Sequence, residues 1–146
     1  MKSICFFLFV FILGCNGQTK KNEKLIDALK DDNIEIRGNL VELGINDYRL
    51  DYYDVYEKDS HYKFLEAKGY QGGGPSWYGI IYGAIKMSEP TILKKIRFDD
   101  EAEGLAIWSS DKKTLIKIGK LISVVKSDKN ILLEAIKVAE KNWKME

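Results

Sequence analysis

Apolar residues that recur at spacings of three and four predict most of the helices in this chain. A short helix is expected at about 22–30 and a second at about 55–69, where Gly69 ends it. A third is expected from Ser76, its predicted N-cap, to Glu89, which precedes a proline. The apolar stripe of the third helix is Trp77, Ile80, Ile81, Ala84 and Ile85.

Two further helices are predicted after residue 109. Ser110 or Asp111 caps the first and Asp128 caps the second. Their apolar stripes are Leu115, Ile118, Ile122 and Val125 in the first, and Leu132, Ile136, Ala139 and Trp143 in the second. The short connection at Ser127-Asp128 predicts that these two helices are antiparallel neighbours.

Between the helices, short apolar runs and alternation predict strands. Gly38-Asn39 lies between two four-residue runs and indicates a tight two-residue hairpin, with one long strand kinked at Gly38 as the alternative. Residues 48–53 alternate, so Tyr48, Leu50 and Tyr52 are expected on a buried face. A second hairpin is predicted from 96–98 and 105–109, joined by an acidic turn.

Strands in pairs and helices in pairs favour an α+β fold, with a small antiparallel sheet of hairpins covered on one face by paired helices. The length of 146 residues suits one domain with a modest core, and this domain is expected to span 22–146.

The N-terminus has a different pattern, typical of a targeting segment. Lys2 precedes ten uncharged residues, 4–13, which is a suitable length for a signal peptide and too short for a membrane span of about 20 residues. The run ends in Leu13-Gly14-Cys15, which resembles a bacterial lipoprotein cleavage site. An ordinary secretory signal, or a buried helix with a chance cysteine, is the alternative.

The lipoprotein resemblance implies that 1–14 is a signal peptide and that Cys15 carries lipid, with 15–21 forming the lipidated residue and a polar tether. The domain is then expected in the cell envelope, anchored to a membrane through Cys15 on its periplasmic or outer side. Cleavage also removes Cys5, so no disulfide could form within the mature chain.

Composition and charge argue against several functions. The formal net charge is +1 and opposite charges are interleaved, so there is no global attraction for nucleic acid. The glycine-rich stretch 70–76 lacks the Gly-Lys-Ser/Thr ending of a phosphate-binding loop. His61 is the only histidine and is expected on the surface. No enzyme, metal site, cofactor or small-molecule substrate is therefore predicted.

The acidic turn carries four carboxylates, on Asp99, Asp100, Glu101 and Glu103. On a hairpin tip they are expected to be solvated and ionised, without the burial that raises a carboxyl pKa for acid–base catalysis. Two interpretations remain: a solvated tip with no partner, or an acidic face that pairs with a basic protein surface. Aromatic residues make up 12% of the chain and fit either a core or a binding face.

Three motifs resemble the immunity protein 51 family, which comprises predicted partners of toxins in bacterial polymorphic toxin systems. The motifs are a glycine-rich loop leading to a tryptophan, an acidic hairpin, and an aromatic-Ser-x-Asp helix start. They are represented here by Gly72, Gly74 and Trp77, by Phe98, Asp99, Glu101 and Ala102, and by Trp108, Ser109 and Asp111. The turn has Asp100 where the family pattern has proline, and the loop differs at Gly73, Pro75 and Ser76.

The resemblance implies inhibition of a cognate protein toxin by stoichiometric binding, without chemistry. The candidate partner-contacting residues are Gly72, Gly74, Trp77, Asp99, Asp100, Glu101, Glu103 and Trp108. The alternative function is that of a cell-envelope lipoprotein with a ligand-binding or structural role unrelated to toxins.

Overall fold

A computed structural model describes residues 19–146 of the chain. The expected signal peptide, Cys15 and the first part of the tether lie outside the described residues.

Four antiparallel strands form one sheet in the order β1-β2-β4-β3. The strands are β1 (Asn39–Gly44), β2 (Asp47–Tyr52), β3 (Arg97–Asp100) and β4 (Leu105–Ser109). Each hairpin supplies one edge strand and one central strand, and β2 pairs with β4 in the middle of the sheet. The predicted hairpin at the acidic turn is therefore confirmed.

The predicted hairpin at Gly38-Asn39 is wrong, because 34–37 is not a strand. This segment is held on a helix instead: Arg37 N–H donates to the Gly119 carbonyl at 3.1 Å and Ser123 Oγ donates to the Glu35 carbonyl at 2.6 Å. Gly38 has a φ of +100°, which turns the chain into β1 and also rules out one continuous kinked strand. The hairpin turn lies at 45–46.

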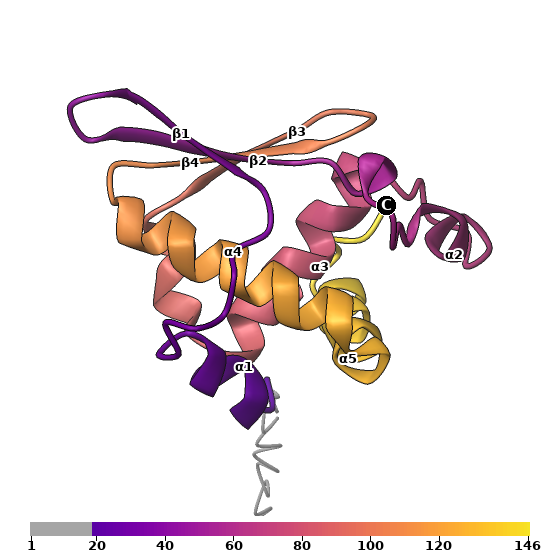
Figure 1. The fold of residues 1–146 in the computed structure, drawn as a ribbon. Helices are drawn as coiled ribbons and strands as arrows, with labels where there is room; N and C mark the ends of the chain where they lie inside the picture. The colour runs from indigo at the N-terminus through magenta and orange to yellow at the C-terminus, as the bar shows by residue number, and fades with distance from the viewer. Residues whose placement is uncertain (1–18) are drawn as a thin grey trace, which may run out of the picture.

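The helices lie on one face of the sheet (Figure 1). They are α1 (Glu23–Ala28), α2 (Tyr62–Glu66), α3 (Gly74–Met87), α4 (Lys112–Ser127) and α5 (Lys129–Lys141), with 3₁₀ turns η1 (Asp54–Tyr56) and η2 (Pro90–Lys94). Both α3 and α4 pack against the sheet, and α5 packs mainly on α3. The predicted α+β fold, with an antiparallel sheet covered on one face by helices, is confirmed.

The predicted helix at 55–69 is broken into η1 and α2. Side chains of the intervening loop take up backbone donors that a continuous helix would use. Asp54 accepts the N–H of His61 at 2.8 Å, and Ser60 Oγ accepts the N–H of Tyr62 at 3.2 Å. The short polar side chains thus favour a loop with a definite conformation.

The start of α3 also differs from the prediction, since Ser76 is not its N-cap. The helix begins at Gly74, and Pro75 in its first turn has the φ that a helix start requires. Ser76 is buried. Its hydroxyl accepts the N–H of Gly72 at 2.8 Å and donates to the carbonyl of Glu146 at 2.6 Å, which joins the glycine-rich loop to the C-terminal residues.

The core follows the predicted stripes closely. Asp111 and Asp128 cap α4 and α5 as expected. The stripe residues of α3 and α4 are buried, as are Leu50 and Tyr52 of β2. Trp143 is the exception: it follows the end of α5, has a φ of +55° and is 93% exposed.

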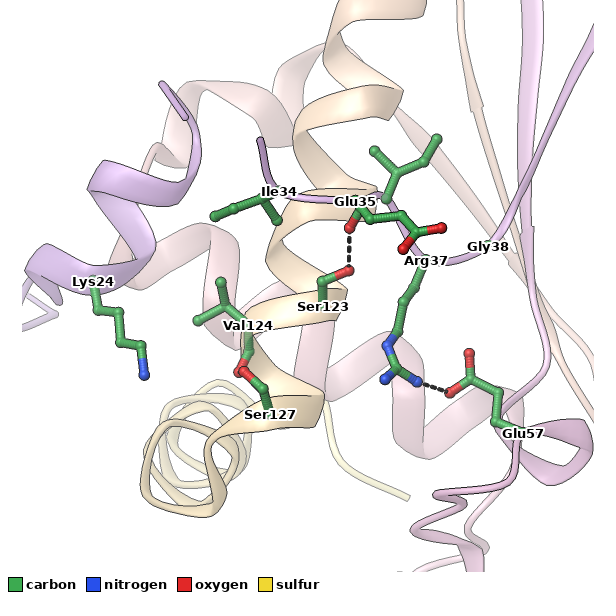
Figure 2. A pocket seen from close by; sticks show the side chains of 10 residues that line it. Lys24, Ile34, Glu35, Arg37, Gly38, Glu57, Ser123, Val124 and Ser127 are labelled. Atoms are coloured by element: carbon green, nitrogen blue, oxygen red, sulfur yellow. Dashed lines mark hydrogen bonds and ion pairs between the residues drawn. The ribbon is translucent and has the colours of Figure 1, made fainter. Parts of the chain in front are cut away.

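The single-residue connection at Asp128 does not make α4 and α5 antiparallel. Figure 2 shows α5 nearly end-on while α4 runs along the page, so the two helices cross steeply. This crossing lets α5 pack on α3.

Among residues 19–146, no helix has the length and apolar character to cross a membrane.

Candidate functional site

The glycine-rich loop and the acidic turn are in direct backbone contact. A methyl group added at Gly73 would overlap the carbonyl of Ala102, and one added at Gly74 would overlap the carbonyl oxygens of Glu101 and Gly104. Only glycine allows two backbones to approach this closely. Two motifs that are about 27 residues apart in the sequence therefore form one rigid unit.

The first turn of α3 forms the base of this unit. Gly74 is the first residue of α3, so the turn carbonyls beside it face the partial positive charge of a helix N-terminus. The turn itself is closed by the N–H of Glu101, which donates to the Gly104 carbonyl at 2.9 Å. The backbone of the turn is thus fixed on both sides.

The carboxylates of the turn point away from this base. Asp99, Asp100, Glu101 and Glu103 are all exposed. Two of them have neighbours: Glu103 accepts the hydroxyl of Tyr56 at 2.9 Å, and Asp99 lies 3.7 Å from Arg97. The hydrogen bond to Glu103 raises the pKa of Tyr56. Such solvated carboxylates suit charge pairing with a partner better than proton transfer.

The candidate contact residues in and directly after the glycine-rich loop have a packing role. Gly72, Gly74 and Trp77 are buried. Trp77 packs edge-on against Tyr52 with ring centroids 4.9 Å apart, in the core between α3 and the sheet. A partner at the surface would not reach these buried residues in this conformation. Gly74 supports the turn, Gly72 packs against Tyr62, and Trp77 belongs to the core.

Trp108 lies on the other face of the sheet, which the helices leave open. It occupies one row across the strands with Val41, Arg49 and Arg97. The two guanidinium carbons lie 5.3 Å and 5.1 Å from the centre of the indole ring, so Trp108 is held between two cations. It remains half-buried on a face that a partner could reach.

A buried ion pair, which the sequence pattern did not reveal, lies behind η1. The ammonium group of Lys126 pairs with Asp54, and their side chains are 0% and 1% exposed. Asp54 also accepts hydrogen bonds from Ser60 Oγ at 3.1 Å and from the N–H of His61. Lys126 donates to the carbonyl of Asp59 at 2.8 Å. The pair therefore ties the loop after β2 to the end of α4.

Two further carboxylates extend this network to the surface. Glu57 lies 3.0 Å from the Lys126 ammonium group and 2.6 Å from Arg37, which also holds Asp59 in two hydrogen bonds. These bonds from Arg37 lower the pKa of Asp59 to about 2. Burial raises the pKa of Tyr52, whose protonated hydroxyl lies 3.2 Å from Glu57. Every charge in the network has an opposite charge beside it.

A pocket of about 680 Å³ opens beside this network, between the 34–38 segment and α4 (Figure 2). Its lining is mixed, with apolar Ile34 and Val124 alongside the backbone-bonded Ser123. Arg37 borders it, but its guanidinium group is engaged by Glu57, as the dashed line in Figure 2 shows. No cluster of groups suited to catalysis converges on it.

His61, expected on the surface, is half-buried as the residue before α2. Its Nδ1 lies 2.8 Å from the Asp59 carbonyl, and its ring lies edge-on to Trp77. In the described part of the chain, no three His, Cys, Asp or Glu side chains are placed to hold a metal ion.

The model of the family described as immunity protein 51 matches residues 39–141, and the chain belongs to this family. The match includes the glycine-rich loop and the acidic turn. It also includes Lys126, Asp54, Glu57 and Asp59 of the ion-pair network, but not Arg37. No curated protein and no solved structure matches the chain.

The contact between the loop and the turn leads to a first prediction. Gly74→Ala should lower the free energy of unfolding by about 1–3 kcal/mol, because the added methyl group must displace the backbone of the turn. Gly44→Ala is the matched control, since its methyl group would point into open space. Urea denaturation measures both, and equal stability of the two variants would contradict the contact.

The buried ion pair leads to a second prediction. Lys126→Met should lower the free energy of unfolding by about 3–5 kcal/mol, since Asp54 would be left charged and buried. Adding Asp54→Asn should restore part of the loss, because the uncompensated charge is removed. Lys137→Met, at an exposed lysine of α5, should change stability by less than about 0.5 kcal/mol. Chemical denaturation of the single and double variants tests this coupling.

Proposed function

We propose that this immunity protein is held at the cell envelope by lipid on Cys15 and neutralises a cognate toxin by stoichiometric binding outside the cytoplasm. The observation that carries the proposal is the acidic turn, which is rigid, exposed and placed at the opposite end of α3 from the start of the described chain. Membership of the immunity protein 51 family supports the toxin as partner.

The two ends of α3 have different roles in this proposal. At its C-terminal end, Lys21 Nζ donates to the Ser88 carbonyl at 2.7 Å and the N–H of Asn22 donates to the Met87 carbonyl at 2.9 Å. At its N-terminal end, Gly74 supports the acidic turn. The helix has 14 residues, which corresponds to a length of about 21 Å.

This geometry would direct the turn away from an anchoring membrane. Figure 1 shows α1 on the far side of the helical layer from the sheet. A lipid on Cys15 would hold the domain by the segment that precedes α1. The turn and the open face of the sheet would then face outward, toward a toxin that arrives from outside.

Charge determines which toxin surface fits the turn. The stretch 98–104 contains four carboxylates and neither lysine nor arginine. An exposed acidic face speeds the encounter with a basic partner and rejects acidic ones. Since the turn is already rigid, little conformational entropy is lost when it binds.

The third prediction tests toxin binding. The chain should protect sensitive cells when the toxin encoded beside its gene is delivered outside the cytoplasm. Replacing Asp99, Asp100 and Glu101 by their amides should slow association with that toxin on the order of tenfold at low salt. Stopped-flow mixing measures this rate. The matched control removes the same charge elsewhere, through Asp27→Asn, Asp47→Asn and Glu66→Gln.

Protection from none of the neighbouring toxins would reject the proposed function. If the two amide variants associate with the toxin at equal rates, the acidic turn is not the contact with the toxin, although the protein could still confer immunity.

The fourth prediction concerns the anchor. Cys15→Ser should remove the site of lipidation, so the protein should move from the membrane fraction to the soluble fraction. Its unfolding curve should match that of the unlipidated wild-type domain, because the expected tether separates Cys15 from the domain. Membrane association that is unchanged in the variant would show that another feature of the chain anchors it.

A further inference from the structure

Two exposed tyrosines stand beside the acidic turn. Tyr53 and Tyr56 are 45% and 72% exposed, and their rings lie 5.9 Å apart at an angle of 43°. Tyr53 directly precedes the short η1 segment that follows β2, and Tyr56 is the last residue of that segment. Tyrosine is enriched at protein interfaces and among the residues that carry most of their binding energy.

The backbone that carries these rings is held from behind. Asp54, between the two tyrosines, points inward to Lys126 and to the N–H of His61. The next residue of the network, Glu57, pairs with Arg37. The rings therefore stand on a fixed backbone, and binding would order only their side chains, at a small entropic cost.

The tyrosines and the turn form one surface. The Tyr56 hydroxyl donates to Glu103 at 2.9 Å. The Tyr53 ring lies directly over Gly104, where an added methyl group would overlap it. No lysine or arginine occurs in 50–56 or in 98–104, the two stretches that build the surface. The two aromatic rings are thus presented together with the exposed carboxylates of Asp100, Glu101 and Glu103.

This chemistry selects one kind of partner. A guanidinium group stacks on an aromatic face and forms paired hydrogen bonds with a carboxylate, whereas an ammonium group forms point contacts. We propose that Tyr53, Tyr56 and Glu103 form the centre of a docking surface for an arginine-bearing face of a partner protein. The inference rests on the proposed function for the toxin as that partner, and it adds the tyrosines as the anchor of the contact.

The fifth prediction uses the toxin encoded beside the gene. Tyr53→Ser combined with Tyr56→Ser should weaken its binding to the full domain at least about tenfold in calorimetry. The matched control is Leu43→Ser with Ile45→Ser, which removes two exposed apolar side chains from the β1–β2 hairpin and should leave affinity unchanged. Tyr56→Phe should lie between wild type and the double variant, because it keeps the ring and loses the bond to Glu103.

Binding by the tyrosine variant at wild-type affinity would overturn the inference while leaving toxin immunity intact. If only the Leu43→Ser, Ile45→Ser control loses binding, the inference is also overturned, because the contact then lies at β1 and β2.

A second measurement decides the inference even if the neighbouring toxins do not bind. Hexa-arginine, hexa-lysine and hexa-glutamate are titrated into the wild-type domain, and backbone amide signals are followed by NMR. Hexa-arginine should shift the signals of Tyr53, Tyr56 and Glu103 at lower concentration than hexa-lysine, and hexa-glutamate should leave them in place. Unmoved signals with hexa-arginine would overturn the proposal. Sedimentation gives a further test. If the wild-type domain is a dimer and the Tyr53→Ser, Tyr56→Ser variant is a monomer, the proposal is also overturned, since the surface would then bind a second copy of the chain.

Discussion

The backbone contact between Gly73-Gly74 and the 101–104 turn is the constraint on which the rest of this structure depends. It fixes where α3 starts, and therefore where the stripe from Trp77 onward enters the core. The same contact holds the β3–β4 hairpin against the helical layer. A side chain larger than hydrogen at either glycine would separate two elements that the sheet and the helix each need in place.

The sequence predicted elements well where local chemistry and burial agree. The stripe of α3, the Asp111 and Asp128 caps and the β3–β4 hairpin all follow from short-range patterns, and the structure confirms them. Predictions failed where a distant partner overrides the local pattern. The 34–37 run has the pattern of a strand, yet Gly119 lets α4 approach it closely, so its backbone bonds to that helix. The 55–69 helix fails because Asp54 is committed to Lys126, 72 residues away.

The same reasoning explains which site residues could be found in advance. The acidic turn was visible because four carboxylates lie together in the sequence. The alternation of 48–53 places Tyr53 on the face opposite Tyr52, away from the core, but no local pattern places Tyr53 or Tyr56 beside the acidic turn. The position of the two tyrosines beside the turn depends on the course of the chain at Asp54, which is paired with a buried lysine of α4. The one signal available was an aspartate in an apolar stretch, which is uncommon inside a protein without a cationic partner.

Pairing within the fold also explains how a nearly neutral protein can present a charged face. Lys126 and Arg37 are neutralised by Asp54, Glu57 and Asp59 within the network. On the open face of the sheet, Arg49 pairs with Asp51 at 2.8 Å beside Trp108. Arg97, the basic residue nearest the turn, lies beside Asp99, whereas the carboxylates of Asp100 and Glu101 remain exposed. A net formal charge of +1 for the whole chain therefore says little about the surface that a partner meets, because what attracts the partner is the local charge that remains after internal pairing.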